Sequence, residues 1–254
     1  MIRVAVAGYA GRMGSAVVDA VTAADDMEVA CGIDPFGKGA GFPTYEAIEQ
    51  AIDSESFDVL VDFTQPSVVA GNVEKALSAG VDCVVGTTGM SNDTLDALAQ
   101  KAVGDACLFY APNFTTGAVL MMQFAKAAAP FFPEAEVLEF HHCNKKDAPS
   151  GTAVRTAQII AAARDFESAA PGSETEIDGC EGARGALVDG VPVHSVRSMG
   201  YVASQEVVFG SMGQTLTIRH DSWDRASYMP GVLLGIRSVG ERSGLVVGLE
   251  EFMD

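Results

Sequence analysis

The chain has 254 residues, with 34 acidic and 16 basic side chains and a formal net charge of −18. Such a charge repels nucleic acid and anionic membranes, and a hydrophobic content of 48% is ordinary for a globular protein. No apolar run approaches the ~20 residues of a membrane span, and no signal peptide is expected. The five scattered cysteines predict reduced thiols. We therefore expect a cytoplasmic protein with neither a nucleic-acid nor a membrane partner.

The first half of the chain alternates apolar runs with helix-like stretches. The predicted strands are residues 2–7, 28–33, 58–63, 81–85 and 107–110, and the predicted helices are 12–24, 45–52, 66–79 and 91–103. Continuous apolar strands between amphipathic helices are typical of a parallel sheet covered on both faces. The sequence therefore predicts an α/β protein that begins with a Rossmann-type, doubly wound parallel sheet.

A different pattern begins after residue 114. Helices are predicted over 116–129 and 150–164, with a strand over 136–142 between them. Residues 165–192 have weak periodicity and predict an irregular connection, followed by strands at 193–197, 205–210 and 215–220. Strands without intervening helices favour an α+β domain with a mixed sheet. A last helix (230–239) and strand (245–248) are expected to return to the first domain.

A glycine-rich turn, Gly8 to Gly14, follows the first predicted strand and opens the first helix. Its G-x-x-G-x-x-G spacing allows a pyrophosphate to approach backbone N–H groups, and Asp34 lies 34 − 14 = 20 residues after the last glycine. We prefer dinucleotide binding to a plain strand-to-helix turn. Asp34 favours NADH, although Lys38 and Arg12 leave NADPH open. The predicted contacts here are Gly8, Tyr9, Ala10, Gly11, Arg12, Met13 and Asp34.

Three further turns follow predicted parallel strands, where open α/β sheets bind their ligands. Each alone is more often an ordinary turn, but together they predict a lining for the nicotinamide half of the groove. Their residues are Phe63, Thr64, Gly86, Thr87, Thr88, Ala111, Pro112, Asn113 and Phe114.

The stretch from His141 to Thr152 gathers two of the four histidines with Lys145 and Lys146. A solvated turn is the ordinary interpretation, but Ser150 begins a glycine-containing helix start that suits a bound anion. We disfavour a metal site, since adjacent residues on a strand point to opposite faces. A nucleophilic Cys143 is also a lesser alternative.

These motifs together resemble a known family. Gly-x-x-Gly-Arg-Met-Gly at 8–14, Asp-Phe-Thr at 62–64, Gly-Thr-Thr-Gly at 86–89, Ala-Pro-Asn-Phe at 111–114 and His-His-x-x-Lys-x-Asp-Ala-Pro-Ser-Gly-Thr-Ala at 141–153 occur in this order in 4-hydroxy-tetrahydrodipicolinate (dihydrodipicolinate) reductases. Ser-Trp-Asp-Arg at 222–225 is similar to the actinobacterial branch. The resemblance implies an NAD(P)H-dependent enzyme that reduces 4-hydroxy-tetrahydrodipicolinate to tetrahydrodipicolinate in diaminopimelate and lysine biosynthesis.

The resemblance also implies a division of labour within the chain. Residues 1–114 and 226–254 would bind the dinucleotide, and residues 115–225 would bind a cyclic dicarboxylate and form a homotetramer. Lys145 would be the proton donor and His141 the acid/base group, with His142, Ser150, Gly151 and Thr152 holding the substrate. Lys146 is a departure from the family's pattern, because it places a second lysine beside Lys145. The alternatives are another two-domain dehydrogenase, acting on an amino acid or a semialdehyde, and a dinucleotide sensor without catalysis.

Overall fold

The computed structural model describes residues 1–37, 39–165, 177, 179–180 and 182–253, so Lys38 lies outside the described residues. The chain divides into two compact units, Met1–Thr116 with Arg225–Asp254 and Gly117–Asp224. The division falls within two residues of the boundaries that we expected at 114 and 226.

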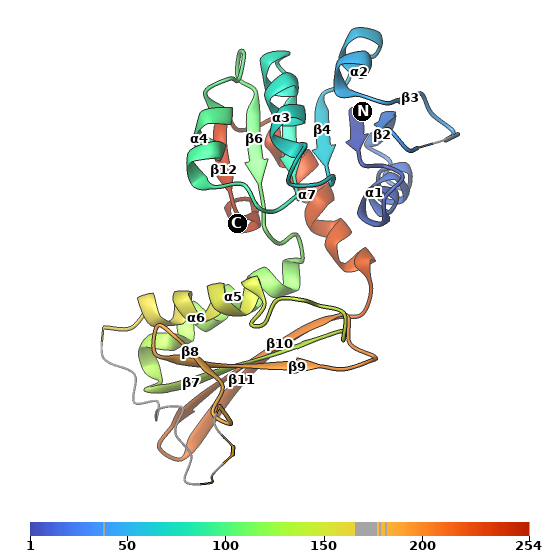
Figure 1. The fold of residues 1–254 in the computed structure, drawn as a ribbon. Coiled ribbons are helices and arrows are strands. Elements are labelled where there is room, and N and C mark those ends of the chain that lie inside the picture. Colours follow the sequence, from blue (N-terminus) through green and yellow to red (C-terminus); the bar gives the residue numbers. More distant parts are fainter. Residues whose placement is uncertain (38, 166–176, 178, 181, 254) are drawn as a thin grey trace. The chain divides into compact units, whose positions relative to one another are not determined.

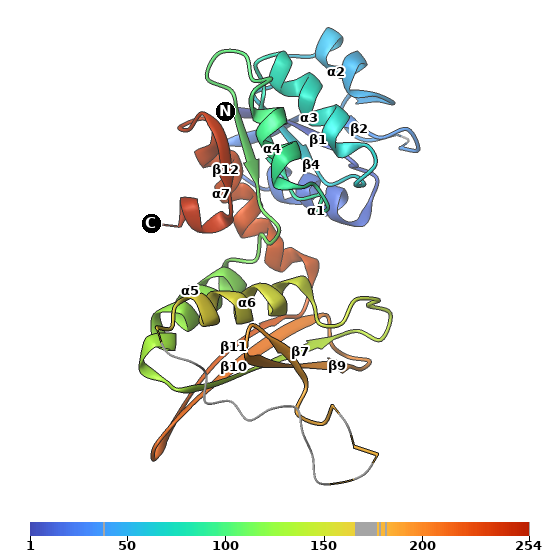
Figure 2. The same ribbon diagram turned by 60° about the vertical axis from the view of Figure 1, so that its left-hand side comes forward.

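Unit 1 contains a seven-stranded sheet in the order β12-β6-β5-β4-β1-β2-β3, in which every described pair is parallel (Figure 1). Helices α2, α3 and α4 cover one face, and α1 and α7 pack against each other on the other face (Figures 1 and 2). The strands are therefore buried on both faces, as their continuous apolar runs predict. The bounds are β1 Ile2–Ala7, α1 Arg12–Thr22, β2 Met27–Ile33, β3 Thr44–Tyr45, α2 Ile48–Ser54, β4 Val59–Asp62, α3 Val69–Ser78, β5 Asp82–Val85, α4 Asn92–Ala99 and β6 Cys107–Tyr110.

The C-terminal segment completes this sheet. After the short helix η2 (Arg225–Tyr228), α7 (Met229–Val239) leads to β12 (Gly244–Val247), which pairs with β6, and to η3 (Leu249–Phe252). A Cβ atom at Gly235 would lie 2.6 Å from the Phe109 ring, and one at Gly231 would lie 2.1 Å from the carbonyl oxygen of Phe114. The two glycines thus let α7 approach β6 and its following turn closely.

Two predicted helices of unit 1 begin later than we expected. Residues 45–52 were predicted as one helix, but Thr44–Tyr45 pairs with β2 as a short edge strand and α2 begins only at Ile48. Residues 66–79 begin with turns, and α3 starts at Val69. By contrast, α4 begins where the predicted helix 91–103 begins, because the hydroxyl of its N-cap Ser91 accepts a hydrogen bond from the Thr94 N–H at 3.2 Å.

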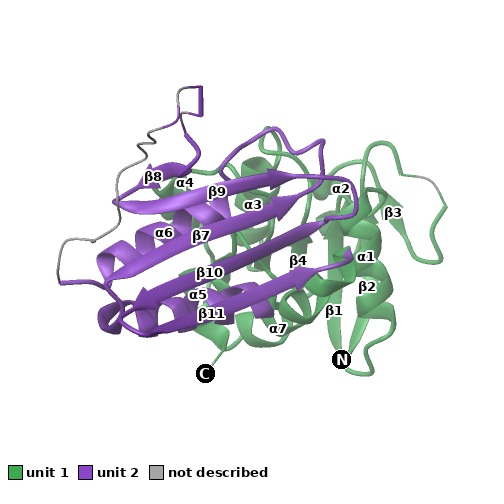
Figure 3. Cartoon of the chain, turned by 90° about the horizontal axis from the view of Figure 1, so that it is seen from below, with its two compact units in different colours: residues 1–116, 225–254 green, residues 117–224 purple. Residues whose placement is uncertain are grey.

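Unit 2 contains a five-stranded mixed sheet in the order β11-β10-β7-β9-β8, in which only β7 and β9 are parallel. Helices α5 and α6 cover one face through a core of alanine, valine, Ile160 and Phe209, and no described helix of this unit covers the other face (Figure 3). The bounds are α5 Thr116–Ala128, η1 Ala129–Phe131, β7 Glu134–His141, α6 Gly151–Ala162, β8 Ala186–Val188, β9 Val191–Arg197, β10 Ala203–Ser211 and β11 Gln214–Ser222. The predicted mixed sheet is confirmed.

The prediction of an irregular segment at 165–192 is wrong at its end. Strands β8 and β9 form a hairpin whose two-residue turn is Asp189-Gly190, with positive φ at both residues. This conformation is that of a type I′ turn, which Asp-Gly favours. The dipeptide was therefore a hairpin signal that periodicity alone did not reveal.

Candidate active site

The glycine turn of unit 1 requires its glycines. Gly8 has φ of +79°, and a Cβ atom there would lie 2.6 Å from the carbonyl oxygen of Phe63. A Cβ atom at Gly14 would lie 2.0 Å from the carbonyl oxygen of Gly8. Helix α1 has no side-chain cap and no acidic residue in its first turn, so no capping side chain or carboxylate occupies its positive end. The turn therefore presents backbone N–H groups as an anion site would.

A cavity of about 760 Å³ lies in front of this turn, a volume within the range of small-molecule and cofactor sites. Seven predicted contacts line it: Gly8, Gly11, Arg12, Met13, Asp34, Phe63 and Thr64. The carboxylate of Asp34 is oriented by the Phe36 N–H, which donates to Oδ1 at 2.9 Å. The cavity also includes Lys75, which pairs with Glu49 and which the sequence did not indicate.

Asp62 is a buried carboxylate that joins two of the predicted turns. Its Oδ1 accepts hydrogen bonds from the Thr64 hydroxyl at 2.6 Å and the Thr87 hydroxyl at 2.9 Å, and its Oδ2 accepts one from the Asn72 amide at 2.9 Å. The turn after β4 is thereby tied to the turn after β5. An Asp two residues before a Thr at a strand end was the local signal for this role.

The remaining predicted contacts of unit 1 differ in their accessibility. The side chain of Tyr9 is 7% exposed and packs edge-on against Phe42, so this residue offers a ligand its main chain. Ala111 and Phe114 are buried, and the Phe114 ring packs against Phe63. Ala10, Thr88 and Pro112 are exposed, Thr87 is buried, and Gly86 and Asn113 are partly buried. Apart from Phe63, none of the predicted contacts named in this paragraph lines the cavity described above.

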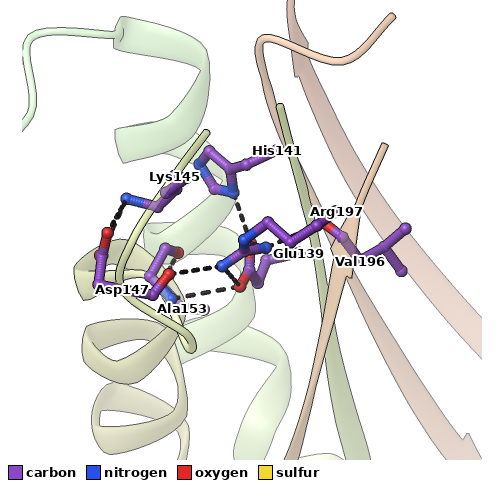
Figure 4. A network of polar contacts seen from close by, with 8 residues as sticks. Glu139, His141, Lys145, Asp147, Ala153, Val196 and Arg197 are labelled. Carbon is purple, nitrogen blue, oxygen red and sulfur yellow. Dashed lines mark hydrogen bonds and ion pairs between the residues drawn. The ribbon is translucent and has the colours of Figure 1, made fainter. Parts of the chain in front are cut away.

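In unit 2, strand β7 ends at the predicted catalytic histidine. His141 is hydrogen bonded through Nδ1 to Glu139, two residues earlier on the same face of the strand (Figure 4). The Glu139 side chain is completely buried, whereas that of His141 is 15% exposed. The glutamate thus fixes the imidazole from the interior.

Arg197, the last residue of β9, lies on the other side of the same carboxylate. Its two terminal nitrogens donate to the two Glu139 oxygens at 2.9 and 2.7 Å, and Nη2 also donates to the main-chain oxygen of Asp147 at 2.7 Å (Figure 4). Burial raises the pKa of Glu139, but hydrogen bonds from His141, Arg197 and Ser195 outweigh it and lower the pKa to about 2. Glu139 is therefore ionised at neutral pH.

Lys145 lies on the loop between β7 and α6. Its Nζ donates to Asp147 at 2.9 Å, and the side chain of Lys145 is 22% exposed while that of Asp147 is 57% exposed. The hydrogen bond from Lys145 lowers the pKa of Asp147. The expected proton donor is therefore held by a solvated carboxylate, beside the strand end that carries His141 (Figure 4).

The start of α6 is arranged as the sequence predicted, with one difference. Ser150 is the N-cap, and its buried hydroxyl accepts a hydrogen bond from the Ala153 N–H at 3.2 Å. The hydroxyl is thus engaged in capping, while Gly151 is exposed and Thr152 partly exposed at the positive end of the helix. His142 is exposed just after β7.

We expect the stability of the folded chain to fall in acid because of Glu139. Its pKa is lowered from 4.5 to about 2 on folding. The contribution is therefore complete above about pH 4.5 and is lost as the pH falls towards 2, and the shift corresponds to roughly 3 kcal/mol of unfolding free energy. Urea unfolding of the native chain and of Glu139→Gln across this range measures the difference. Parallel pH dependences in the two proteins would contradict the assignment.

No three His, Cys, Asp or Glu side chains among the described residues lie together as metal ligands would. Over the same part of the chain, no helix has the length and apolar character to cross a membrane. A glycine turn at the carboxyl edge of a doubly wound sheet, joined in one chain to a histidine and lysine site on a mixed-sheet unit, defines a dinucleotide-dependent oxidoreductase.

Comparison with known proteins supports this class. Residues 2–114 match the family described as dihydrodipicolinate reductase, N-terminus, and residues 117–253 match dihydrodipicolinate reductase, C-terminus. The 4-hydroxy-tetrahydrodipicolinate reductases of Mycobacterium sp. (strain KMS) and Nocardia farcinica (strain IFM 10152) are each 49% identical to this chain, covering 100% of it and 99% of the relative. The chain belongs to the dihydrodipicolinate reductase family.

A solved relative has a similar structure over nearly the whole chain. The dipicolinate-bound dihydrodipicolinate reductase from Paenisporosarcina sp. TG-14 is 40% identical, with a TM-score of 0.87 and 99% coverage of both chains. A probable dehydrogenase from Thermotoga maritima shares the fold at 13% identity and a TM-score of 0.65. The predicted fold class and family are both confirmed.

Proposed function

We propose that the chain reduces 4-hydroxy-tetrahydrodipicolinate to tetrahydrodipicolinate in diaminopimelate and lysine biosynthesis. The observation that carries the proposal is the site of unit 2, where His141 at the end of β7, Lys145 on the following loop and the N-terminus of α6 lie together. In a chain of net charge −18, such a cluster provides local attraction for a substrate with two carboxylates. The names of the relatives and the dipicolinate bound to the solved relative agree with this substrate class.

The residues divide the chemistry among them. Gly151 and Thr152 hold a substrate carboxylate at the helix start, with Ser150 capping the same helix and His142 alongside. Lys145 donates a proton from Nζ to the ring as it is reduced, and His141 acts as an acid and base through Nε2 because Nδ1 is engaged by Glu139. One hydride and one proton are added, and one water leaves the hydroxylated ring.

Unit 1 fits a nicotinamide dinucleotide, which supplies the hydride when it is bound. The turn from Gly8 to Met13 would hold the pyrophosphate, and Asp34, which lines the cavity, would accept hydrogen bonds from the adenosine ribose. The turns after β4, β5 and β6 would hold the nicotinamide half. Because the Asp34 carboxylate would repel a ribose phosphate, NADH is preferred, while Arg12 and Lys75 in the same cavity leave NADPH usable.

The working form is a cytoplasmic homotetramer. The face of the unit 2 sheet opposite α5 and α6 carries no helix of that unit among the described residues, which leaves it available for pairing with other copies (Figure 3). The reaction needs no nucleic acid, membrane or metal partner.

A coupled assay tests the proposal. Aspartate semialdehyde, pyruvate and the preceding synthase generate the substrate, and loss of reduced nicotinamide absorbance reports the reaction. We expect oxidation that depends on the synthase, with kcat/KM higher for NADH than for NADPH. Oxidation of neither dinucleotide would overturn the proposal, and a higher value for NADPH would overturn the cofactor assignment alone.

A further inference from the structure

The interior behind the unit 2 site contains a charged pair that the proposed reaction does not use directly. We infer that Glu139 and Arg197 are positioning residues, which fix the tautomer of His141 and the course of the loop that carries Lys145. The inference deepens the proposed function and rests on it for its catalytic consequence. It also makes a structural claim about the His141 ring that is independent of any activity.

Glu139 acts on the histidine. Its carboxylate is completely buried and bonded to Nδ1 of His141. An ionised carboxylate only accepts hydrogen bonds, so Nδ1 must carry a proton. The neutral ring is therefore the Nδ1–H tautomer, with the lone pair on Nε2, the nitrogen that faces away from the carboxylate. A carboxylate behind Nδ1 thus decides which nitrogen is free for chemistry.

Arg197 connects the same carboxylate to the loop. Its Nη2 bridges Glu139 at 2.7 Å and the main-chain oxygen of Asp147 at 2.7 Å. The N–H of Ser150 also donates to Glu139, at 3.3 Å. The loop is thereby attached to the pair on both sides of its Asp147–Ser150 segment. Because Lys145 bonds to the side chain of Asp147, the anchorage also sets the position of Nζ.

Stability alone does not account for a pair at this position. A buried ion pair loses much of its attraction to the cost of removing both charges from water, and an apolar replacement is often equally stable. Here each charge also makes a directed contact to a chemical group of the site, His141 on one side and the loop backbone on the other. Contacts of this kind orient catalytic groups without touching the substrate themselves.

The experiment compares the native chain with Glu139→Gln and Arg197→Lys. The amide in Glu139→Gln keeps the shape of the side chain but removes its charge. The amine in Arg197→Lys keeps the positive charge but removes the paired guanidinium nitrogens. The matched control is Asp26→Asn, which removes another two-bond arginine pair, to Arg237 in unit 1 at 2.8 and 3.0 Å. Each protein is measured by the coupled assay, by NADH fluorescence titration and by long-range ¹H–¹⁵N spectra of the imidazoles. The His141 signals are assigned by their loss in His141→Asn.

We expect the native spectrum to show His141 as the Nδ1–H tautomer and Glu139→Gln to change it. The kcat of Glu139→Gln should fall on the order of 100-fold or more, as for other histidines deprived of their orienting carboxylate. The kcat of Arg197→Lys should fall by about tenfold or more, and its KM for the substrate should rise. NADH affinity should stay within about twofold in both variants, and Asp26→Asn should behave as the native chain, since these changes leave the described cofactor cavity intact.

An Nε2–H tautomer in the native spectrum would overturn the inference, and this measurement needs no variant to fold. A folded Glu139→Gln protein with native kcat and native imidazole signals would overturn it as well. If the native chain shows no synthase-dependent oxidation, the proposed function fails, while the spectrum still decides whether Glu139 sets the His141 tautomer.

Discussion

Replacement of Lys145 by alanine should lower kcat by about 10²- to 10⁴-fold, because a positioned proton donor contributes on this scale. The fold should be unaffected, since the Lys145 side chain is partly exposed and its partner Asp147 is largely solvated. The measurement is the rate of synthase-dependent NADH oxidation at saturating substrate. NADH affinity, measured by fluorescence, should stay near the native value.

Lys146→Ala is the matched control for this change. Lys146 is the exposed neighbour on the same loop, and its removal changes the local charge by the same amount without removing the lysine that Asp147 holds. We expect it to retain most of the native kcat. A large loss in Lys146→Ala with near-native activity in Lys145→Ala would transfer the proton-donor role to the second lysine.

Gly14→Ala should abolish detectable dinucleotide binding or weaken it by more than tenfold. The added Cβ atom would lie 2.0 Å from the carbonyl oxygen of Gly8 and 2.8 Å from the Cα atom of Tyr9. Both atoms belong to the backbone, so the start of α1 must move away from the turn that presents the N–H groups. We also expect about 1–3 kcal/mol of lost unfolding free energy from overpacking.

Gly71→Ala provides the comparison for that variant. Gly71 is an exposed glycine within α3, and a Cβ atom there would meet nothing within 4 Å. Alanine should therefore leave NADH affinity unchanged and stabilise the chain by roughly 0.5–1 kcal/mol. Fluorescence titration and urea unfolding of both variants make the test. Native NADH affinity in Gly14→Ala would show that the turn does not hold the pyrophosphate.

The sequence by itself determined much of this protein. Unbroken apolar runs such as residues 2–7 predicted the doubly wound sheet, because strands buried on both faces cannot alternate polar and apolar residues. The spacing from Gly8 to Asp34 indicated the cofactor turn, and the stretch from His141 to Thr152 indicated both the family and the second site. These signals are local: periodicity, turn chemistry and motif spacing are all contained within short segments of chain.

Only the tertiary structure decided which residues stand behind those motifs. Arg197 reaches Glu139 across 58 residues of sequence, and Asp62 joins Thr64 to Thr87 across 25. The pairing of β12 with β6 depends equally on distant segments. Such contacts produce no periodic pattern in the sequence. They depend on the order of the strands in each sheet and on which distant polar groups are brought together to satisfy a buried charge.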